Sequence, residues 1–400
     1  MKVIFKILIV SLMFVSLLTH AVLDIKITQG IEQALPIAVV PFSWSKSNAN
    51  VPVEVTKIIT DNLKRSGRFD VMDGRDLPQQ PTEFSAINFN DWRKLGMTEK
   101  VFITGGSGLL ALNWALAIRQ KQAVTLGLHE RIVSLAGVQT QKVDLESVEH
   151  LVRTFEDSQT SMVVHTAGFT SVEQCEAKPD VAQHINVDLA SNVAKACAKL
   201  GVPLIHISTD HLFSGEMPML TETSPVAPVN VYGRTKAEAE LRVLDAHPSS
   251  LVLRTNFYGW GTSYRQSFSD MIIDKLRNDQ ELTLFQNALY TPILIETVVQ
   301  VANELVKLKA RGVFNVVGDD RISKYKFGLK LAQKFNLDTS FVQSGHIENQ
   351  IAPVQRPYDM SLSNEKVSKL LGKKLGGVSE HLSMLYEQEQ NGLAHEMRSL

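Results

Sequence analysis

The sequence predicts an α/β protein whose main part is a doubly wound parallel sheet, followed by a smaller C-terminal lobe and preceded by a partial α/β segment. From residue 100 onward, short apolar stretches alternate with stretches of helical spacing, which is typical of a parallel sheet covered by helices. A glycine-rich turn joins the first of these strands to a helix. With 400 residues and 44% hydrophobic content, the chain can bury a large core in more than one domain.

Composition argues against several classes of function. The formal net charge is -1 and no long run of like charge occurs, so nothing indicates binding to nucleic acid or to an anionic membrane. The 2 cysteines, Cys175 and Cys197, form neither a disulfide framework nor a metal-binding spacing, and we expect them to be buried. The histidines also lack a ligand spacing, so we predict no metal site.

Residues 1–21 have the pattern of a secretory signal peptide. Lys2 and Lys6 accompany a strongly apolar stretch at residues 7–18, and Thr19-His20-Ala21 fits a cleavage site loosely. The uncharged run is shorter than the roughly 18 residues that a membrane span needs, so we expect no stable span. If used, this peptide would direct export to the periplasm.

Residues 22–96 are predicted to contain a strand at 36–42, a helix at 53–63 and a second strand at 68–72. Over roughly residues 1–96 the chain resembles the N-terminal domain of TolB, the periplasmic component of the Tol-Pal system. The stretches that carry this resemblance are PIAVVPF (36–42), LKRSGRF (63–69) and LPQQP (77–81). It implies a Tol-Pal contact if the segment is functional.

The further strands and the propeller that a TolB-like domain should have next do not follow residue 96. An α/β layer that is cut short exposes a sheet edge and an apolar face. We therefore expect this truncated segment to be marginally stable or partly disordered alone. We interpret it as a leftover piece rather than as a working interaction surface.

Met97 stands where an initiator would stand, a few residues before the first strand of the main sheet, so the chain is interpreted as two proteins joined end to end. Strands are predicted at 101–104, 123–128, 162–166, 204–208 and 251–254. This pattern assigns residues 97–256 to the sheet domain and residues 257–400 mainly to a substrate-binding lobe.

The turn after the first strand has the spacing of a Rossmann-type dinucleotide-binding turn. Gly105 is placed for the tight bend and Gly108 for close approach of the backbone to a pyrophosphate, while Ala111 stands where a third glycine is common. The phosphates would lie at the N-terminus of the following helix. Taken alone, such a turn also arises from packing. The predicted cofactor contacts in this stretch are Gly105, Ser107, Gly108, Leu109 and Leu110.

The residues that follow the next two strands indicate which nicotinamide cofactor the chain would bind. An NAD enzyme usually offers a carboxylate to the ribose after its second strand, but here Arg131 could pair with the 2′-phosphate of NADP(H). A solvated surface arginine is the alternative. We therefore favour NADP(H) slightly over NAD(H). Asp144, beside Leu145, is predicted to contact the adenine.

Tyr232 and Lys236 are spaced to lie on one face of a predicted helix. Because a nearby cation favours phenolate over phenol, Lys236 is expected to lower the pKa of Tyr232, which suits proton transfer to a carbonyl oxygen. Ser208, Thr209 and Asp210 end a strand at the edge where open α/β sheets bind ligands. A lone Tyr-x-x-x-Lys spacing would more often belong to an ordinary helix surface.

The order of these motifs resembles the extended short-chain dehydrogenase/reductase family. Within it, the chain is most similar to the dTDP-4-dehydrorhamnose reductase (RmlD-like) sugar-nucleotide branch, over about residues 97–390. The stretches that carry the resemblance are HTAG (165–168), NVD (186–188), STDHLFSG (208–215), NVYGRTK (230–236), LRTN (253–256) and Arg356-Pro357.

The resemblance implies roles for individual residues. Tyr232 would protonate the keto oxygen as hydride arrives, Lys236 would bind the nicotinamide ribose, and Thr209 would hold the carbonyl oxygen. Asn186 would brace the active-site strand and helix. The other implied contacts are Ala167, Gly168, Phe169 and Thr170 along the cofactor, and Asp210, Asn256 and Phe257 beside the substrate.

Two departures from the branch leave the substrate open. Phe257 stands where the rhamnose-pathway reductases have a tryptophan near the sugar, and His211 stands where they have a tyrosine. Related dehydratases carry a glutamate at the place of His211, so dehydration chemistry is not expected.

Three functions remain in view. The first is an NADP(H)- or NAD(H)-dependent reductase of a nucleotide-linked keto sugar, in the cytoplasm, for polysaccharide precursors. The second is a non-catalytic binding protein that keeps the fold, as regulatory relatives do. The third is an exported Tol-Pal interaction protein, which residues 1–96 alone support. Because the periplasm offers no pool of nicotinamide cofactor or nucleotide sugar, we interpret the reductase as the working unit, and leave a homodimer open.

Overall fold

The computed structural model describes residues 35–37, 39, 55–66, 69–72, 99–349 and 354–400, and the chain divides into two units, Met1–Trp92 and Arg93–Leu400. In the first unit, β1 (Leu35–Ile37) pairs in parallel with β2 (Phe69–Val71), and α2 (Val55–Arg65) lies between them in sequence. This confirms the predicted order of strand, helix and strand, while residues 38, 40–42, 53–54 and 68 of the predicted ranges lie outside the described residues. The proposed signal peptide at residues 1–21 lies outside the described residues.

The second unit is built on a seven-stranded parallel sheet of order β13-β8-β7-β6-β3-β4-β5. The strand order is that of a doubly wound sheet, so the predicted fold class is confirmed. The sequence assigned the stretch around residues 312–318 to the substrate lobe, whereas β13 forms an edge of the main sheet. The strands are β3 (Lys100–Thr104), β4 (Ala123–Leu128), β5 (Gln139–Lys142), β6 (Met162–His165), β7 (Leu204–Thr209), β8 (Leu251–Thr255) and β13 (Gly312–Asn315).

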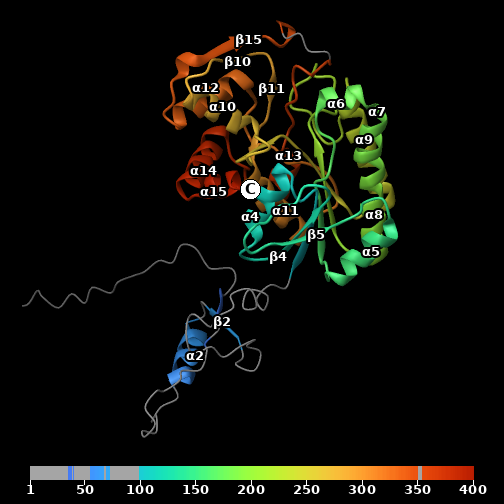
Figure 1. Cartoon of the computed structure of the whole chain (residues 1–400), viewed down its shortest axis with the longest axis vertical. Coiled ribbons are helices and arrows are strands. Elements are labelled where there is room, and N and C mark those ends of the chain that lie inside the picture. Colours follow the sequence, from blue (N-terminus) through green and yellow to red (C-terminus); the bar gives the residue numbers. More distant parts are fainter. Residues whose placement is uncertain (1–34, 38, 40–54, 67–68, 73–98, 350–353) are drawn as a thin grey trace, which may run out of the picture. The chain divides into compact units, whose positions relative to one another are not determined.

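Helices cover both faces of this sheet (Figure 1). One face carries α5 (Val148–Asp157), α8 (Leu189–Leu200) and α9 (Val231–Ala246), which pack side by side. The other carries α4 (Leu109–Ile118) and α11 (Ile295–Lys307). Between β6 and α8 the chain forms α6 (Val172–Ala177), α7 (Pro179–Gln183) and a π-helical turn, η2 (His184–Asp188).

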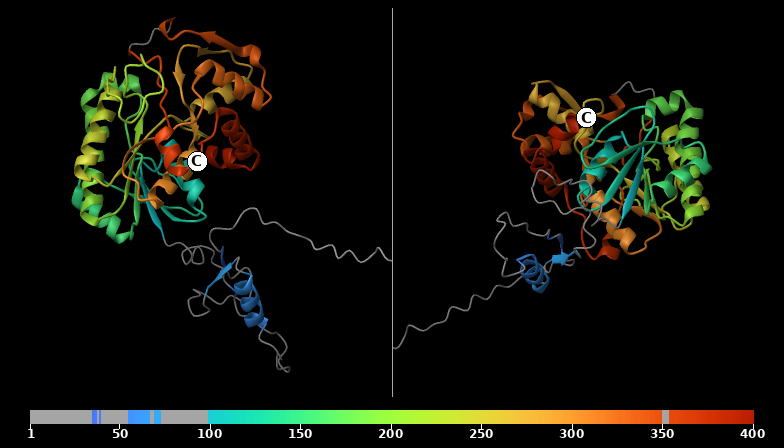
Figure 2. Two further views of the ribbon diagram at one scale, coloured as in Figure 1. Left: turned by 180° about the vertical axis from the view of Figure 1, so that it is seen from behind. Right: turned by 60° about the horizontal axis from the view of Figure 1, so that its bottom comes forward.

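The C-terminal lobe consists of short strand pairs and helices. In both views of Figure 2 its orange and red elements group on the side of the sheet away from the green helices. No helix in the described part of the chain is long and apolar enough to cross a membrane. The lobe contains β9 (Phe257–Tyr258), α10 (Phe268–Arg277), β10 (Leu282–Phe285), β11 (Leu289–Tyr290), β12 (Ile293–Leu294), β14 (Ile322–Ser323), α12 (Lys324–Lys334), η3 (Thr339–Phe341), β15 (Val342–Gly345), η4 (Ile347–Asn349), α13 (Glu365–Leu371), α14 (Val378–Gln390) and α15 (Leu393–Arg398).

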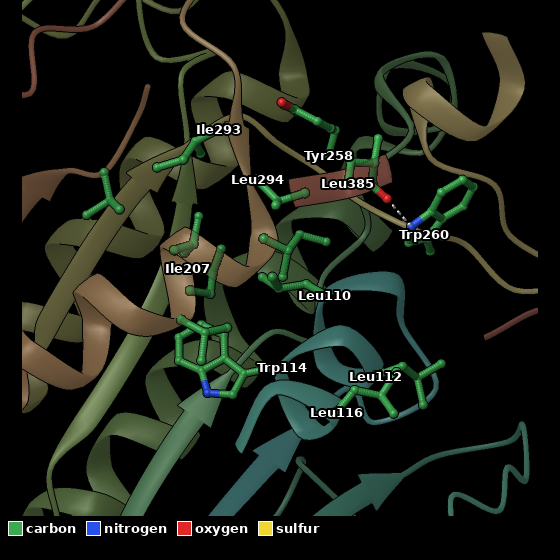
Figure 3. Packing of buried hydrophobic residues seen from close by; sticks show 14 of the residues in the cluster. Leu110, Leu112, Trp114, Leu116, Ile207, Tyr258, Trp260, Ile293, Leu294 and Leu385 are labelled. Carbon is green, nitrogen blue, oxygen red and sulfur yellow. Dashed lines mark hydrogen bonds between the residues drawn. The ribbon is translucent and has the colours of Figure 1, made fainter. Parts of the chain in front are cut away.

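One apolar core joins the sheet to this lobe through α4. Trp114 of α4 is fully buried and belongs to the same cluster as Ile207 of β7, Tyr258 of β9 and Leu385 of α14 (Figure 3). The indole of Trp260 donates a hydrogen bond of 3.2 Å to the carbonyl of Leu385. Because Trp114 shares this cluster with residues of the lobe, and Asn113 of α4 donates a hydrogen bond to the carbonyl of Trp260, the lobe is fixed to the helix that follows the glycine-rich turn.

We expect a chain that begins at Met97 to fold as the second unit does within the full chain, because its core draws on residues from Val101 onward. Thermal unfolding followed by near-ultraviolet circular dichroism should give the same midpoint for both forms. Trp114→Ala should lower the free energy of unfolding by about 3–5 kcal/mol in each. A fragment without a cooperative transition would contradict this independence.

Candidate active site

The glycine-rich turn forms a cradle between β3 and α4. Gly105 has φ of 69°, and a Cβ there would lie 2.7 Å from the backbone nitrogen of Ala167. A Cβ at Gly106 would lie 2.7 Å from Cβ of Leu126, so this glycine, which the sequence analysis did not single out, is the one pressed against the sheet. Neither position tolerates a side chain without movement of its neighbours.

The first turn of α4 is open to a ligand. Its N-cap, Gly108, adopts an extended conformation, and no side chain caps the helix. The first N–H groups of a helix have no intrahelical partners and carry the positive end of its dipole, so an uncapped start suits a phosphate. The cradle and the open helix start together fit the dinucleotide that the sequence predicted.

The other predicted cofactor residues follow neighbouring strands at the same edge of the sheet. Arg131 follows β4, Asp144 and Leu145 follow β5, and residues 167–170 follow β6, while β3 pairs with both β4 and β6. Asp144 is exposed and accepts a hydrogen bond of 2.9 Å from the backbone N–H of Glu146. The structure therefore brings the predicted cofactor segments to one edge.

Asn186 connects the loop after β6 to α9. Its Oδ1 accepts a hydrogen bond of 2.7 Å from the N–H of Phe169, and its Nδ2 donates to the carbonyl of Phe169 at 3.1 Å and to the hydroxyl of Thr235 at 3.0 Å. This is the brace that the sequence analysis predicted. The asparagine lies in the π-helical turn η2, an irregularity that is frequent at functional sites.

Thr209, Tyr232 and Lys236 converge where β7 ends beneath α9. Asn230 caps α9 by accepting a hydrogen bond of 2.9 Å from the N–H of Gly233, which fixes the start of the helix. The Thr209 hydroxyl hydrogen-bonds with the Tyr232 phenol. The buried Lys236 ammonium donates a hydrogen bond of 2.7 Å to the carbonyl of Ile207 on β7. The chain thus places three candidate catalytic side chains together.

The electrostatics of Tyr232 differ from the sequence-based expectation. Burial raises the pKa of Tyr232 to about 12, and the hydrogen bond with Thr209 and the charge of Arg265 oppose this shift only in part. We expected Lys236 to lower this pKa, and that expectation was wrong because the cost of burying a phenolate is larger than the opposing effects. The phenol therefore keeps its proton at neutral pH.

Burial shifts the pKa of Lys236 in the opposite direction to that of Tyr232. It lowers the pKa of the ammonium to about 8, while the neighbouring carboxylate of Glu240 raises it. Beneath Lys236, the rings of His165 and His206 stack with centroids 5.4 Å apart. Burial and the charge of Lys236 lower the pKa of both imidazoles, that of His165 to about 3, so both rings are neutral.

Three residues were predicted to lie beside the substrate: Asp210, Asn256 and Phe257. The first two form a hydrogen-bonded pair, and the third packs in the apolar core. Asp210 is buried; it accepts a hydrogen bond from Nδ2 of Asn256 and another of 3.2 Å from the Thr209 hydroxyl. Phe257 is half-buried and packs against the main apolar core. Asp210 and Asn256 are thus well placed to hold Thr209.

A cavity of about 370 Å³ opens beside these residues and is formed largely by the lobe. His211 contributes to its wall and packs edge-on against Tyr232, with ring centroids 5.6 Å apart. Lys324 and Arg356 are the other basic residues of the wall, and the apolar part includes Phe268, Met271 and Phe285. Both His211 and Arg356 belong to motifs noted in the sequence, whereas nothing in the sequence singled out Lys324.

The two cations of this cavity keep hydrogen-bonding capacity for a ligand. The Lys324 ammonium lies 4.3 Å from the ring centroid of Phe268, and no hydrogen-bond acceptor or carboxylate within the described ranges pairs with it. Burial lowers its pKa to about 8, although the charge of Asp210 opposes this. Arg356 pairs with Glu173 through Nη2, while its buried Nε has no partner among the described residues.

A buried ion pair lies beneath α9 and was missed by the sequence analysis. Arg254 of β8 donates three hydrogen bonds to the carboxylate of Glu240, two from Nε at 2.9 and 3.2 Å and one from Nη2 at 2.7 Å. The Ser208 hydroxyl donates a further one of 2.5 Å. Both charged side chains are about 95% buried, with exposures of 4% and 5%. Glu240 lies one helical turn after Lys236, so this pair joins α9 to β7 and β8 at the site.

Comparisons with known proteins agree with this architecture. A family profile described as the RmlD substrate binding domain matches residues 99–391, and one described as the TolB amino-terminal domain matches residues 23–106. Both resemblances predicted from the sequence are thereby confirmed. The two matches overlap over residues 99–106.

Curated relatives cover most of the second unit. A probable low-salt glycan biosynthesis reductase of Haloferax volcanii is 27% identical and covers 71% of this chain and 96% of its own. The methionine adenosyltransferase 2 subunit beta of Mus musculus is 29% identical, with coverages of 68% and 83%. A dTDP-4-dehydrorhamnose reductase of Sinorhizobium fredii is 27% identical, with coverages of 69% and 93%.

Solved structures share the fold. The dTDP-4-dehydrorhamnose reductase of Bacillus anthracis in complex with NADP has a TM-score of 0.65 and 23% identity, and the match covers 73% of this chain and 100% of that one. MoeE5 in complex with UDP-glucose and NAD has a TM-score of 0.60 and 18% identity, with coverages of 74% and 99%. Proteins of this fold therefore bind either nicotinamide cofactor.

The ion pair beneath the site gives a stability prediction. Glu240→Gln leaves Arg254 buried without a counter-charge, so we expect the free energy of unfolding to fall by about 3–5 kcal/mol in urea denaturation. Glu238→Gln is the matched control, because its partner Arg242 lies on the exposed side of the same helix at 3.4 Å. That change should stay within about 1 kcal/mol. Equal effects of the two substitutions would show that the buried pair does not anchor the helix.

Proposed function

Because the chain belongs to the RmlD substrate binding domain family, which matches residues 99–391, we propose that it is an NAD(P)H-dependent reductase of a nucleotide-linked 4-keto sugar. The observation that carries this proposal is the convergence of Thr209, Tyr232 and Lys236 at the edge of the sheet that also holds the glycine cradle. Such a reductase would serve the synthesis of polysaccharide precursors.

The cofactor, when bound, supplies the hydride, and the side chains manage the proton and the developing charge. Tyr232 donates its proton to the keto oxygen, a role that its raised pKa supports because the phenol remains protonated at neutral pH. The Thr209 hydroxyl, which donates to Asp210 in the structure, would turn its proton to the same oxygen when the substrate is bound. Lys236, fixed by the carbonyl of Ile207, holds the nicotinamide ribose and places positive charge beside the site.

Arg131 supports NADP(H) as the preferred cofactor. Its side chain is exposed after β4, and no hydrogen bond or ion pair from it to another described residue is present. A guanidinium with free N–H donors suits the 2′-phosphate, which only NADP(H) carries. NAD(H) is the alternative cofactor.

The cavity beside Tyr232 is the proposed site of the nucleotide sugar. Lys324 and Arg356 would neutralise the phosphate groups, and the apolar wall around Phe268 and Met271 would pack against the base or sugar. A wall of this kind supports a phosphorylated substrate rather than a neutral one.

The proposed compartment of the reductase is the cytoplasm, where nicotinamide cofactors and nucleotide sugars are available. An exported Tol-Pal interaction protein is an alternative that the TolB amino-terminal match at residues 23–106 favours. A binding subunit without turnover is a second alternative, favoured by the 29% identity to a methionine adenosyltransferase subunit. Retention of Thr209, Tyr232 and Lys236 in one site supports the enzyme over both.

Tyr232→Phe tests the proposed chemistry. Loss of the proton donor should lower kcat by about 10²–10⁴-fold with a keto-sugar nucleotide, measured as consumption of the reduced nicotinamide. Affinity for the cofactor, measured by its fluorescence in the absence of substrate, should change little. A wild-type chain that binds cofactor but turns over no member of a nucleotide-sugar panel would favour the binding-subunit alternative.

The pKa of Lys236 predicts the alkaline limb of the pH profile. As the pH rises through about 8, the ammonium loses its proton, so kcat should fall. The Tyr232 phenol, with a pKa of about 12, stays protonated over this range. Lys236→Arg should move the limb to higher pH because a guanidinium does not titrate there.

Lys324 provides the control for this profile, because its pKa is also about 8 but it lies in the proposed substrate cavity. Its deprotonation should raise KM for the nucleotide sugar and leave kcat nearly unchanged. Lys324→Met should remove the pH dependence of KM alone. An alkaline limb in kcat that persists in Lys236→Arg would contradict the assignment.

A further inference from the structure

One turn of the C-terminal lobe contacts three segments predicted to bind the cofactor. Thr262 and Arg265 close this turn through two backbone hydrogen bonds, of 3.0 and 3.3 Å. Its tip carries Tyr264, which is half-buried, and its end carries Arg265, which is exposed. We call residues 262–265 the lobe turn.

The lobe turn contacts segments that are predicted to bind different parts of the dinucleotide, from the adenosine end to the nicotinamide end. The Tyr264 hydroxyl donates a hydrogen bond of 2.8 Å to the carbonyl of Ser107 in the glycine-rich turn. The Arg131 guanidinium lies over the Tyr264 ring, 3.9 Å from its centroid. Nη2 of Arg265 donates a hydrogen bond of 2.8 Å to the hydroxyl of Thr170, after β6.

The chain holds the lobe turn in place from its base. Nδ2 of Asn113, on α4, donates a hydrogen bond of 2.8 Å to the carbonyl of Trp260 just before the turn. A Cβ at Gly261 would lie 2.4 Å from the carbonyl oxygen of Arg265, so the turn is packed closely on itself. After the turn, Ser267 and Asp270 form a capping box that starts α10. The turn is therefore preorganised rather than an extended loop.

The two arginines have hydrogen-bond donors to spare and no negative partner. Among the described residues, Arg131 has only the ring of Tyr264 as a partner, and Arg265 only the hydroxyl of Thr170. An arginine stacked on an aromatic face keeps the N–H groups at its edge for a phosphate. The positive charge of Arg265 also acts on Tyr232, so it lies within electrostatic range of the catalytic phenol.

We propose that the lobe turn is part of the cofactor site, in which Tyr264 holds Arg131 ready for the 2′-phosphate and Arg265 binds the pyrophosphate. The inference rests on the proposed function only in requiring a nicotinamide dinucleotide as ligand. It makes the lobe a contributor to cofactor affinity as well as to substrate binding. It also assigns the discrimination between NADPH and NADH to a pair of residues rather than to Arg131 alone.

The test measures binding of NADPH and NADH to the full chain by nicotinamide fluorescence, without substrate. Tyr264→Leu removes the stack as well as the hydrogen bond to Ser107, and it should weaken NADPH binding roughly 5–10-fold more than NADH binding, since only NADPH carries the 2′-phosphate. Tyr264→Phe keeps the ring and should retain the preference for NADPH. Arg265→Gln should weaken both cofactors about tenfold or more, because both contain the pyrophosphate.

Arg153→Gln is the matched control, since Arg153 is an exposed arginine on α5. It should leave both dissociation constants unchanged. Wild-type affinities for both cofactors in Tyr264→Leu and Arg265→Gln would overturn the proposal, as would a wild-type chain that binds neither cofactor. If Tyr264→Leu does not fold, the proposal is tested by the cofactor dissociation constants of Arg265→Gln, since Arg265 is exposed. Cofactor binding that follows this pattern without any turnover would refute the proposed reductase and still support the lobe turn.

Discussion

The position of helix α4 is the constraint on which the rest of the second unit depends. Apart from Leu109 and Ala117 its residues are buried, so the helix cannot leave the space between the sheet and the lobe without exposing a large apolar surface. Its open N-terminus is thereby held at the carboxyl edge of the sheet. Asn113 of the same helix fixes the chain at Trp260, just before the lobe turn. One buried helix therefore positions the phosphate cradle, the lobe and the turn that reaches back to the cofactor segments.

A second set of buried polar contacts fixes α9, which carries Tyr232 and Lys236, against the opposite face of the sheet. Asn186 ties α9 to the loop after β6, and the pair of Glu240 and Arg254 ties it to β8. These polar groups are satisfied by one another, so they hold the helix that carries Lys236 and Tyr232 in place. Burial has opposite effects on Tyr232 and Lys236, because it raises the pKa of a phenol and lowers that of an ammonium. The same enclosure thus keeps the Tyr232 phenol protonated and makes the charge of Lys236 sensitive to pH.

Local patterns predicted much of this unit, and long-range contacts account for what they missed. The strands around β3, the bend at Gly105 and the placement of Tyr232 and Lys236 one turn apart on α9 follow from spacing within a few residues. The cavity joins His211, Lys324 and Arg356, which are far apart in the chain, so no local spacing marks them as one site. The ion pair likewise joins α9 to β8, and the direction of the Tyr232 pKa depends on burial, which spacing does not report.

The overlap of the two family matches at residues 99–106 is resolved by the hydrogen bonding of β3. Every residue from Lys100 to Thr104 pairs with β4, and Val101 to Thr104 also pair with β6, so both edges of the strand are occupied. A strand paired on both edges has no free backbone groups for another sheet. Gly105 and Gly106 then pack directly against Ala167 and Leu126 of the same unit. In this fold residues 99–106 therefore belong to the second unit, because their backbone and side-chain contacts lie within it.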